Sequence, residues 1–178
     1  LARQGNAEHR DAVLGALDKL NPKSLNELQR LTWLRNYQLA MIRLGQPSDE
    51  QRAKLVAKLD PLFPSADSAF DAELVQLLVY LGSPTVVAKG VEIIEQLASQ
   101  GEPAPPWGEI AKRHAGYGGT VRAMMDNMPP VRSIHYAFVL RNAEQGWTND
   151  LRRRYLSFFS QAALHPGGSS YPGFIQQM

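Results

Sequence analysis

The chain has 178 residues, a net charge of +2 and no cysteine. This length suits one domain with a core of its own, and 44% apolar with 20% charged residues is typical of an ordinary soluble protein. The lack of cysteine excludes disulfides, thiolate metal ligands, a cysteine nucleophile and covalent c-type haem attachment within this chain. No apolar run approaches the roughly 20 residues that span a bilayer.

The charge is spread unevenly, with a mild basic excess after residue 100. This excess is too small for the footprint of a nucleic-acid-binding protein, so no nucleic-acid partner is predicted. The chain begins at Leu1 with a helix-like stretch and has no recognisable signal peptide. We interpret it as a piece of a larger protein, in which case the missing signal carries no information.

The first half of the chain predicts helices in succession. The first covers about 6–20 and ends at Asn21-Pro22. Ser24 is expected to cap the second, with Glu27 completing a capping box, and apolar residues then recur at helical spacing to Leu44. Ser48 is expected to cap the third helix, which Pro64 stops.

Two joints between helices are near copies of each other. They are 44–48, Leu-Gly-Gln-Pro-Ser, and 81–85, Leu-Gly-Ser-Pro-Thr, and 146–148, Gly-Trp-Thr, is a looser third version. In each, a glycine can end one helix and a serine or threonine can start the next. The predicted fold is therefore all-α: stacked antiparallel helical hairpins, as in a HEAT-like α-solenoid. Gly90 lies inside the helix after the second joint, where a close helix crossing would compensate its poor helix propensity.

Residues 101–132 interrupt this pattern as a Gly/Pro-rich insertion. It holds a proline-rich connector, a short helix at about 107–114, a glycine-rich turn, and a helix from about Thr120 to Asn127. A last hairpin pairs 133–145 with 149–164, and an unfinished segment begins at Tyr171. We expect one helical-repeat domain over 1–178, with first hairpins in 1–100, the insertion in 101–132, and the last hairpin in 133–178. Insertions on one face of a repeat stack are often where binding resides.

The insertion carries the sharpest candidate site, a nest for a small anion. Backbone N–H groups freed by glycine, a helix start and basic side chains together suit such a ligand. The candidate ligand-binding residues are Arg113, His114, Tyr117, Gly118, Gly119, Thr120 and Arg122. The alternative is a flexible turn in which Thr120 merely caps the next helix. The spacing fits neither a Walker A loop nor a dinucleotide fingerprint.

The consecutive Arg152, Arg153 and Arg154 are candidate partner-binding residues. They could meet a phosphate or an acidic partner, or they could be the solvated face of a helix. His135 is expected at a helix–helix contact, and the loop at His165 reads as a second anion site or a helix stop. No helical metal-ligand pair and no Gly-x-Ser-x-Gly elbow occurs, so no catalytic residue, metal or cofactor is predicted.

A series of motifs over roughly 25–178 resembles one family. The motifs are Trp107-Gly108-Glu109-Ile110, Tyr117-Gly118-Gly119, Asn127-Met128-Pro129-Pro130, Ile134-His135-Tyr136-Ala137, Gly146-Trp147-Thr148 and Gly167-Gly168-Ser169-Ser170-Tyr171. In this order they are similar to the helical-repeat modules of large exported proteins from planctomycetes and their relatives. The resemblance implies an exported, periplasmic or cell-envelope protein whose neighbouring domains include a cytochrome c-type haem domain and sometimes a sugar-dehydrogenase-like propeller. It implies no catalytic residue for this module, and the Cys-x-x-Cys-His that would hold haem is absent from this chain.

Three hypotheses follow. The first is a non-catalytic scaffold that contacts neighbouring domains or a partner protein. The second is a module for a small anion or acidic saccharide, and the third is an accessory part of an active site that another domain completes. We expect this segment on its own not to be an enzyme, while the third hypothesis keeps a catalytic role in a larger protein open.

Overall fold

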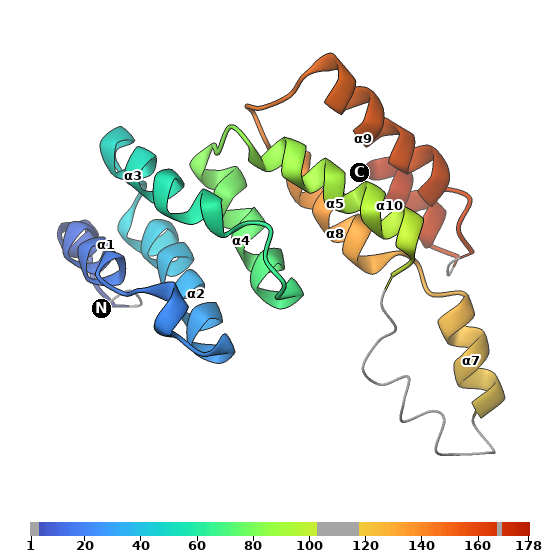
Figure 1. The fold of residues 1–178 in the computed structure, drawn as a ribbon, viewed down its shortest axis with the longest axis horizontal. Helices are drawn as coiled ribbons and strands as arrows, with labels where there is room; N and C mark the ends of the chain where they lie inside the picture. Colours follow the sequence, from blue (N-terminus) through green and yellow to red (C-terminus); the bar gives the residue numbers. More distant parts are fainter. Residues whose placement is uncertain (1–3, 103–117, 167–168) are drawn as a thin grey trace. The chain divides into compact units, whose positions relative to one another are not determined.

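A computed structural model describes residues 4–102, 118–166 and 169–178 of the chain (Figure 1). All regular structure within these ranges is helical, which confirms the all-α prediction. None of the helices in the described ranges is long and apolar enough to cross a membrane. The short helix predicted at 107–114 lies outside the described residues.

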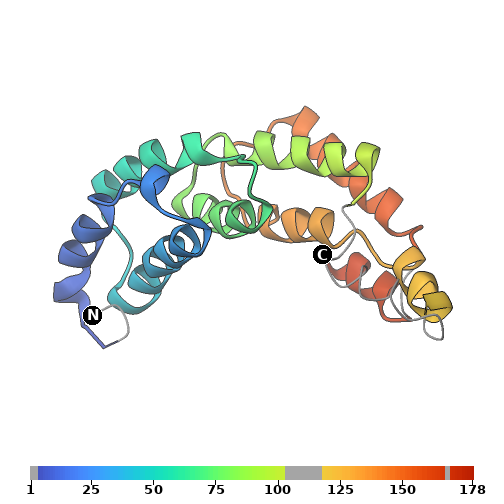
Figure 2. The same ribbon diagram turned by 60° about the horizontal axis from the view of Figure 1, so that its bottom comes forward.

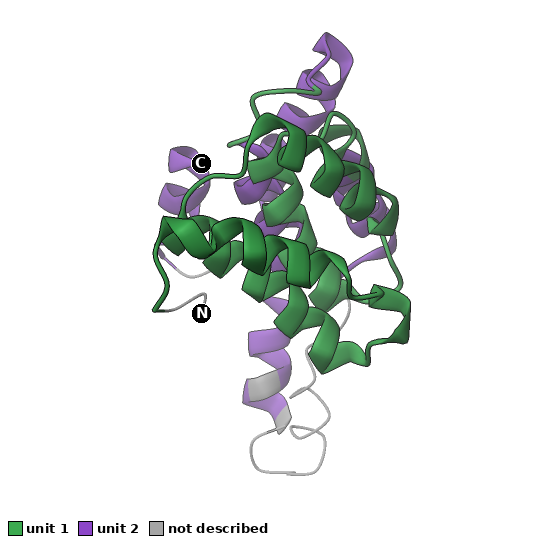
Figure 3. Cartoon of the chain, turned by 90° about the vertical axis from the view of Figure 1, so that its left-hand side faces the viewer, with its two compact units in different colours: residues 1–89, 142–146 green, residues 90–141, 147–178 purple. Residues whose placement is uncertain are grey.

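The chain divides into two compact units, coloured separately in Figure 3. Unit 1 comprises residues 1–89 and 142–146, and unit 2 comprises residues 90–141 and 147–178. One helix, α5 (Val86–Gln100), supplies its first residues to unit 1 and the remainder to unit 2.

Unit 1 is built on four further helices. They are α1 (Arg10–Asp18), α2 (Glu27–Leu44), α3 (Asp49–Leu59) and α4 (Ser68–Leu81). Helix α2 contacts both α1 and α4, and α3 contacts α4 (Figure 2). Trp33, Leu34 and Tyr37 of α2 are almost fully buried, and the Trp33 indole N–H donates to the Leu17 carbonyl at 3.0 Å. The α2 core face is thus fastened to α1 by a hydrogen bond as well as by apolar packing.

The helix starts in unit 1 match the predictions in part. Ser48 caps α3 as expected, forming a capping box with Gln51. The predicted cap at Ser24 is wrong, because α2 begins at Glu27 and its N-cap is Asn26, two residues after Ser24. The Asn26 side chain accepts a hydrogen bond from the backbone N–H of Gln29 at 2.9 Å. The Gln29 side chain in turn accepts one from the backbone N–H of Asn26 at 3.0 Å. Ser24 instead closes a short 3₁₀ turn, where its hydroxyl donates to the carbonyl of residue 21.

Glycines at all three joints adopt positive φ. The values are +99° at Gly45, +70° at Gly82 and +83° at Gly146. Gly82 has the left-handed conformation that ends a helix, whereas Gly45 combines its positive φ with an extended ψ of 168°. A Cβ on Gly146 would lie 2.7 Å from the carbonyl oxygen of Pro84, so the third joint has room only for glycine. The second and third joints therefore touch within unit 1.

A polar cluster around Asp60 fastens the end of α3 to the second joint. The Asp60 carboxylate accepts hydrogen bonds from the hydroxyls of Ser83 and Thr85, and from the Lys89 ammonium at 2.8 Å. Burial alone would raise the pKa of Asp60, but the hydrogen bonds from Lys89, Ser83 and Thr85 outweigh burial and lower it. Thr85, expected as a helix cap, thus directs its hydroxyl to this carboxylate.

Unit 2 contains α7 (Gly118–Asp126), α8 (Val131–Leu140), α9 (Asn149–Ala162) and α10 (Tyr171–Gln177), packed with the rest of α5. Thr148 caps α9 as predicted, accepting from the Leu151 N–H at 3.1 Å. The helix predicted over 133–145 is shorter: it starts at Val131 and ends at Leu140. Helix α7 begins at Gly118, so Thr120 lies inside its first turn and does not cap it.

The core of unit 2 is closed by tight packing and by hydrogen bonds from buried tyrosines. A Cβ on Gly90 would lie 2.8 Å from Cδ1 of Leu140, which bears out the predicted close crossing of α5 with another helix. The Tyr155 hydroxyl donates to the Ala137 carbonyl at 2.8 Å and joins α9 to α8. Burial raises the pKa of Tyr155 to about 12, so this hydroxyl stays a donor across the ordinary pH range.

Candidate functional site

The predicted anion nest is only partly within the described residues. Arg113, His114 and Tyr117 lie outside them. Gly118, Gly119 and Thr120 form the first turn of α7, and Arg122 follows on the same helix with an exposed side chain. Within the described residues, α7 therefore holds Gly118, Gly119, Thr120 and Arg122, while Arg113, His114 and Tyr117 stay a prediction.

The three consecutive arginines lie in the first half of α9, and two of them have partners within unit 2. Arg154 forms a bidentate ion pair with Glu95 of α5, with N···O distances of 2.7 and 2.6 Å. The hydrogen bond from Arg154 lowers the pKa of Glu95 and raises that of Arg154 itself. Arg153 pairs with Asp150 one turn away, and Arg152 is exposed. Arg154 thus joins α9 to α5, which leaves Arg152 as the arginine of this run most open to a partner.

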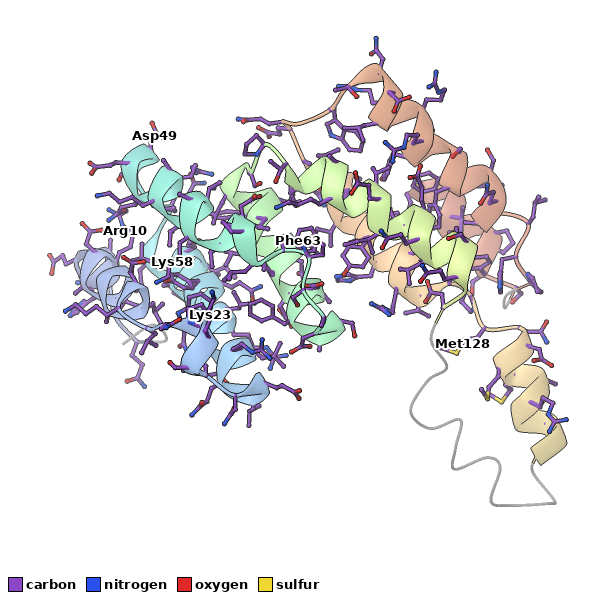
Figure 4. All side chains as sticks on the ribbon, viewed as in Figure 1. Arg10, Lys23, Asp49, Lys58, Phe63 and Met128 are labelled. Carbon is purple, nitrogen blue, oxygen red and sulfur yellow. The ribbon has the colours of Figure 1, made fainter. Side chains whose placement is uncertain are left out.

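Unit 2 also holds a cavity, and among its described lining residues only His165 belongs to a site that the sequence predicted. Its volume is about 510 Å³, within the range of sites for small molecules or short peptide segments. Half of the lining comes from the predicted insertion, from Gly101 to Pro130. The insertion therefore contributes to a hollow surface of unit 2, through residues other than those first singled out. Figure 4 marks Met128, one of the lining residues, in the connection between α7 and α8.

The cavity is built at helix ends. Leu97 and Ala98 belong to the last turn of α5, Met125 and Asp126 to the last turn of α7, and Gln161 and Ala162 to the end of α9. Helix α8 contributes Ser133 from its first turn, and Pro129 and Pro130 directly precede that helix. Three C-terminal ends and one N-terminal end thus surround a single space.

Glu102 occupies the one N-terminal end. Its carboxylate accepts from the backbone N–H groups of Arg132 and Ser133 and from the Ser133 hydroxyl, each at 2.8 Å. The carboxylate therefore caps α8 from 30 residues away in sequence and neutralises the partial positive charge of that helix end. Ser133 is almost fully buried, so its hydroxyl is held in place as a donor to Glu102.

The remaining lining combines apolar and polar side chains. Apolar surface comes from Leu97, Met125, Met128 and Phe158. Polar groups come from Asp126, Gln161 and His165, besides Glu102 and Ser133. The Nδ1 atom of His165 lies 2.8 Å from the Pro166 carbonyl oxygen, which it can meet as a donor. Such a lining suits reversible binding, with polar groups orienting a ligand against an apolar wall.

The described part of the chain brings no three metal-ligating side chains together. His135 lies half-buried on α8, with its ring 5.8 Å edge-to-face from Tyr136. The ring of the half-buried Trp147 packs 5.0 Å from Tyr155, and Trp33 is a core residue of unit 1. These two tryptophans pack against other aromatic or backbone groups of their own unit, while Trp107 lies outside the described residues.

Sequence reasoning missed Glu102, the two methionines and Gln161 as lining residues. Nothing local links Glu102 to Ser133, which follows 31 residues later and is paired with it only in the folded chain. The available signal was the placement of an acid directly after a helix end and before a proline-rich stretch. Comparison with known proteins found no family model, curated protein or solved structure that matches this chain.

Proposed function

We propose that this chain is a non-catalytic helical-repeat scaffold that mediates protein–protein or inter-domain contacts within a larger protein. The observation that carries this proposal is the open cavity of unit 2, half of whose lining comes from the insertion. A hollow at the ends of four helices offers a partner an anchoring pocket on a rigid frame.

The repeated joints support the HEAT-like solenoid part of the proposal. The first two joints each end a helix at a positive-φ glycine and start the next helix within a few residues. The exported, cytochrome-associated setting rests on the resemblance of the sequence motifs alone. On that resemblance the partners would be neighbouring domains of a redox protein, and this chain would contribute binding without holding a cofactor.

The experiment is partner capture followed by reconstitution with the purified partner. The bait chain would be compared with Ala98→Trp, which fills the cavity, and with Ser99→Trp, its matched control. Both positions are exposed in the last turn of α5, and of the two only Ala98 lines the cavity. We expect the control to keep the partner and Ala98→Trp to lose it. A surface alanine scan that leaves every contact with the purified partner intact would sink the scaffold proposal.

The alternative, a module for a small anion or acidic saccharide, is favoured by the start of α7 at Gly118 and the exposed Arg122. Calorimetry with sulfated and carboxylated saccharides tests it, and the variant in which Arg113, His114 and Arg122 become alanine is its control. Flat titrations with the wild-type chain would remove this alternative. No observation on the described residues separately favours the third hypothesis, an accessory part of an active site.

A further inference from the structure

The charged side chains that line the cavity of unit 2 favour one sign of ligand. Among the described residues that line it are the carboxylates of Glu102 and Asp126, and no lysine or arginine. His165 is the other titratable side chain there, and its Nδ1 is directed to the Pro166 carbonyl. Opposite charges attract, so this lining favours a cation over an anion.

The surrounding helix ends add to that preference. The C-terminal end of an α-helix carries a partial negative charge, and α5, α7 and α9 all end at the cavity. The single N-terminal end, that of α8, already has the Glu102 carboxylate as its counter-charge. Among the described helices, an anion entering the cavity would thus meet three C-termini and the Asp126 carboxylate, but no free N-terminus.

The cavity wall also requires an apolar part in the ligand. Leu97, Met125, Met128 and Phe158 line it, and methionine side chains adapt to ligands of different shape. Side chains of Gln161 and Asp126 supply oxygens that can accept hydrogen bonds from a donor. A ligand that matches both features has an apolar body and a positively charged nitrogen that donates hydrogen bonds.

We infer that the cavity at the ends of α5, α7, α8 and α9 binds an organic cation: an ammonium or guanidinium group on an alkyl or aryl body. The cation can be a free amine, or the lysine or arginine side chain of a partner protein. In the second form the inference rests on the proposed scaffold function and names the chemistry of the partner's anchor. The first form is independent of that function.

The test uses three probes that share an aryl body and differ in charge: 2-phenylethylammonium, 2-phenylethanol and 3-phenylpropionate. Binding is followed by NMR chemical-shift changes of unit 2 amides in the whole chain at pH 8, where imidazole is ordinarily uncharged. Ligands this small commonly bind with a Kd of about 1–10 mM, which NMR titration measures. We expect the ammonium to bind at the cavity and the carboxylate to fail.

Two pairs of variants locate the effect. Ala98→Trp fills the cavity and should weaken ammonium binding about tenfold or more, whereas Ser99→Trp should leave it unchanged. Asp126→Asn removes a lining charge and should weaken it about two- to fivefold. Its control is Glu92→Gln, the same loss of charge at an exposed position of α5 outside the lining. Circular dichroism of each variant checks that the fold is kept.

Peptides distinguish the two sources of the cation. An acetylated, amidated Phe-Lys dipeptide is compared with the same dipeptide carrying norleucine in place of lysine. Tighter binding of the lysine peptide than of 2-phenylethylammonium indicates a partner side chain, and the reverse order indicates a free amine. Equal binding of the three aryl probes, or ammonium binding that Ala98→Trp leaves intact, overturns the inference. If the ammonium fails while a purified partner is still held, the inference falls and the scaffold proposal stands.

Discussion

Replacing Gly90 by alanine should destabilise unit 2, although alanine is the better helix former. In an open helix this change gains about 1 kcal/mol. At Gly90 the new Cβ would lie 2.8 Å from Cδ1, 3.1 Å from Cδ2 and 3.2 Å from Cγ of Leu140. The Leu140 side chain is fully buried, so it cannot swing away into solvent. Overpacking of this kind costs about 1–3 kcal/mol, so we expect a net loss of up to about 2 kcal/mol.

Gly15 offers a matched control. It lies inside α1, and a Cβ there would meet nothing within 4 Å. Gly15→Ala should therefore stabilise its helix by up to about 1 kcal/mol, so the two alanine variants should differ by about 1–3 kcal/mol.

The assay is hydrogen exchange of the α5 and α8 amides, because two compact units need not unfold in one step. The double variant Gly90→Ala with Leu140→Ala removes the three crowded atoms. Leu140→Ala alone should cost about 2–5 kcal/mol. The double variant should cost less than the sum of the single changes by about 1 kcal/mol or more. Opening free energies of Gly90→Ala equal to or above the wild type would refute the reasoning from close packing.

Three further changes probe the polar contacts. Asp60→Asn should lower the free energy of unfolding by about 1–3 kcal/mol at pH 7. Folding lowers the pKa of Asp60, so the stabilisation by this carboxylate is complete above the ordinary carboxyl pKa and is lost as pH falls through the lower folded value. In urea denaturation, the free energies of unfolding of the wild type and Asp60→Asn should therefore converge below about pH 4. Glu102→Gln should weaken the protection of the Ser133 amide by about 1–2 kcal/mol in hydrogen exchange, while Glu92→Gln leaves it unchanged. Tyr155→Phe should lower the free energy of unfolding in urea by about 1 kcal/mol. It should also remove one tyrosine ionisation near pH 12 from a spectrophotometric titration.

Local sequence signals predicted the joints of the fold well. Ser48 and Thr148 cap their helices, since a cap depends on residues within one turn. Gly90 indicated a close crossing because a glycine inside a helix needs a compensating contact. The cap at Ser24 failed because Asn26 is an equally good cap and has a glutamine at the matching position.

The candidate site could be predicted only as a region. The insertion does contribute half the cavity lining, but the pairing of Glu102 with Ser133 depends on how α5 and α8 pack. Basic residues drew attention to an anion, whereas the cavity that forms carries acidic side chains and helix C-termini. Local composition does not tell which helix ends come together in the folded chain, and those ends help to decide whether the cavity favours a cation or an anion.

The shared helix α5 governs how the protein can be cut into pieces. A fragment ending at Lys89 would break α5 after its first turn and would also lose 142–146, which belong to unit 1. That fragment would lack Gln145 beside Gly82 and Gly146 against Pro84. We therefore expect residues 1–89 to fold less stably alone than within the whole chain. Adding back residues 90–178 as a separate polypeptide should restore part of that stability, as in complementation between the fragments of a split protein.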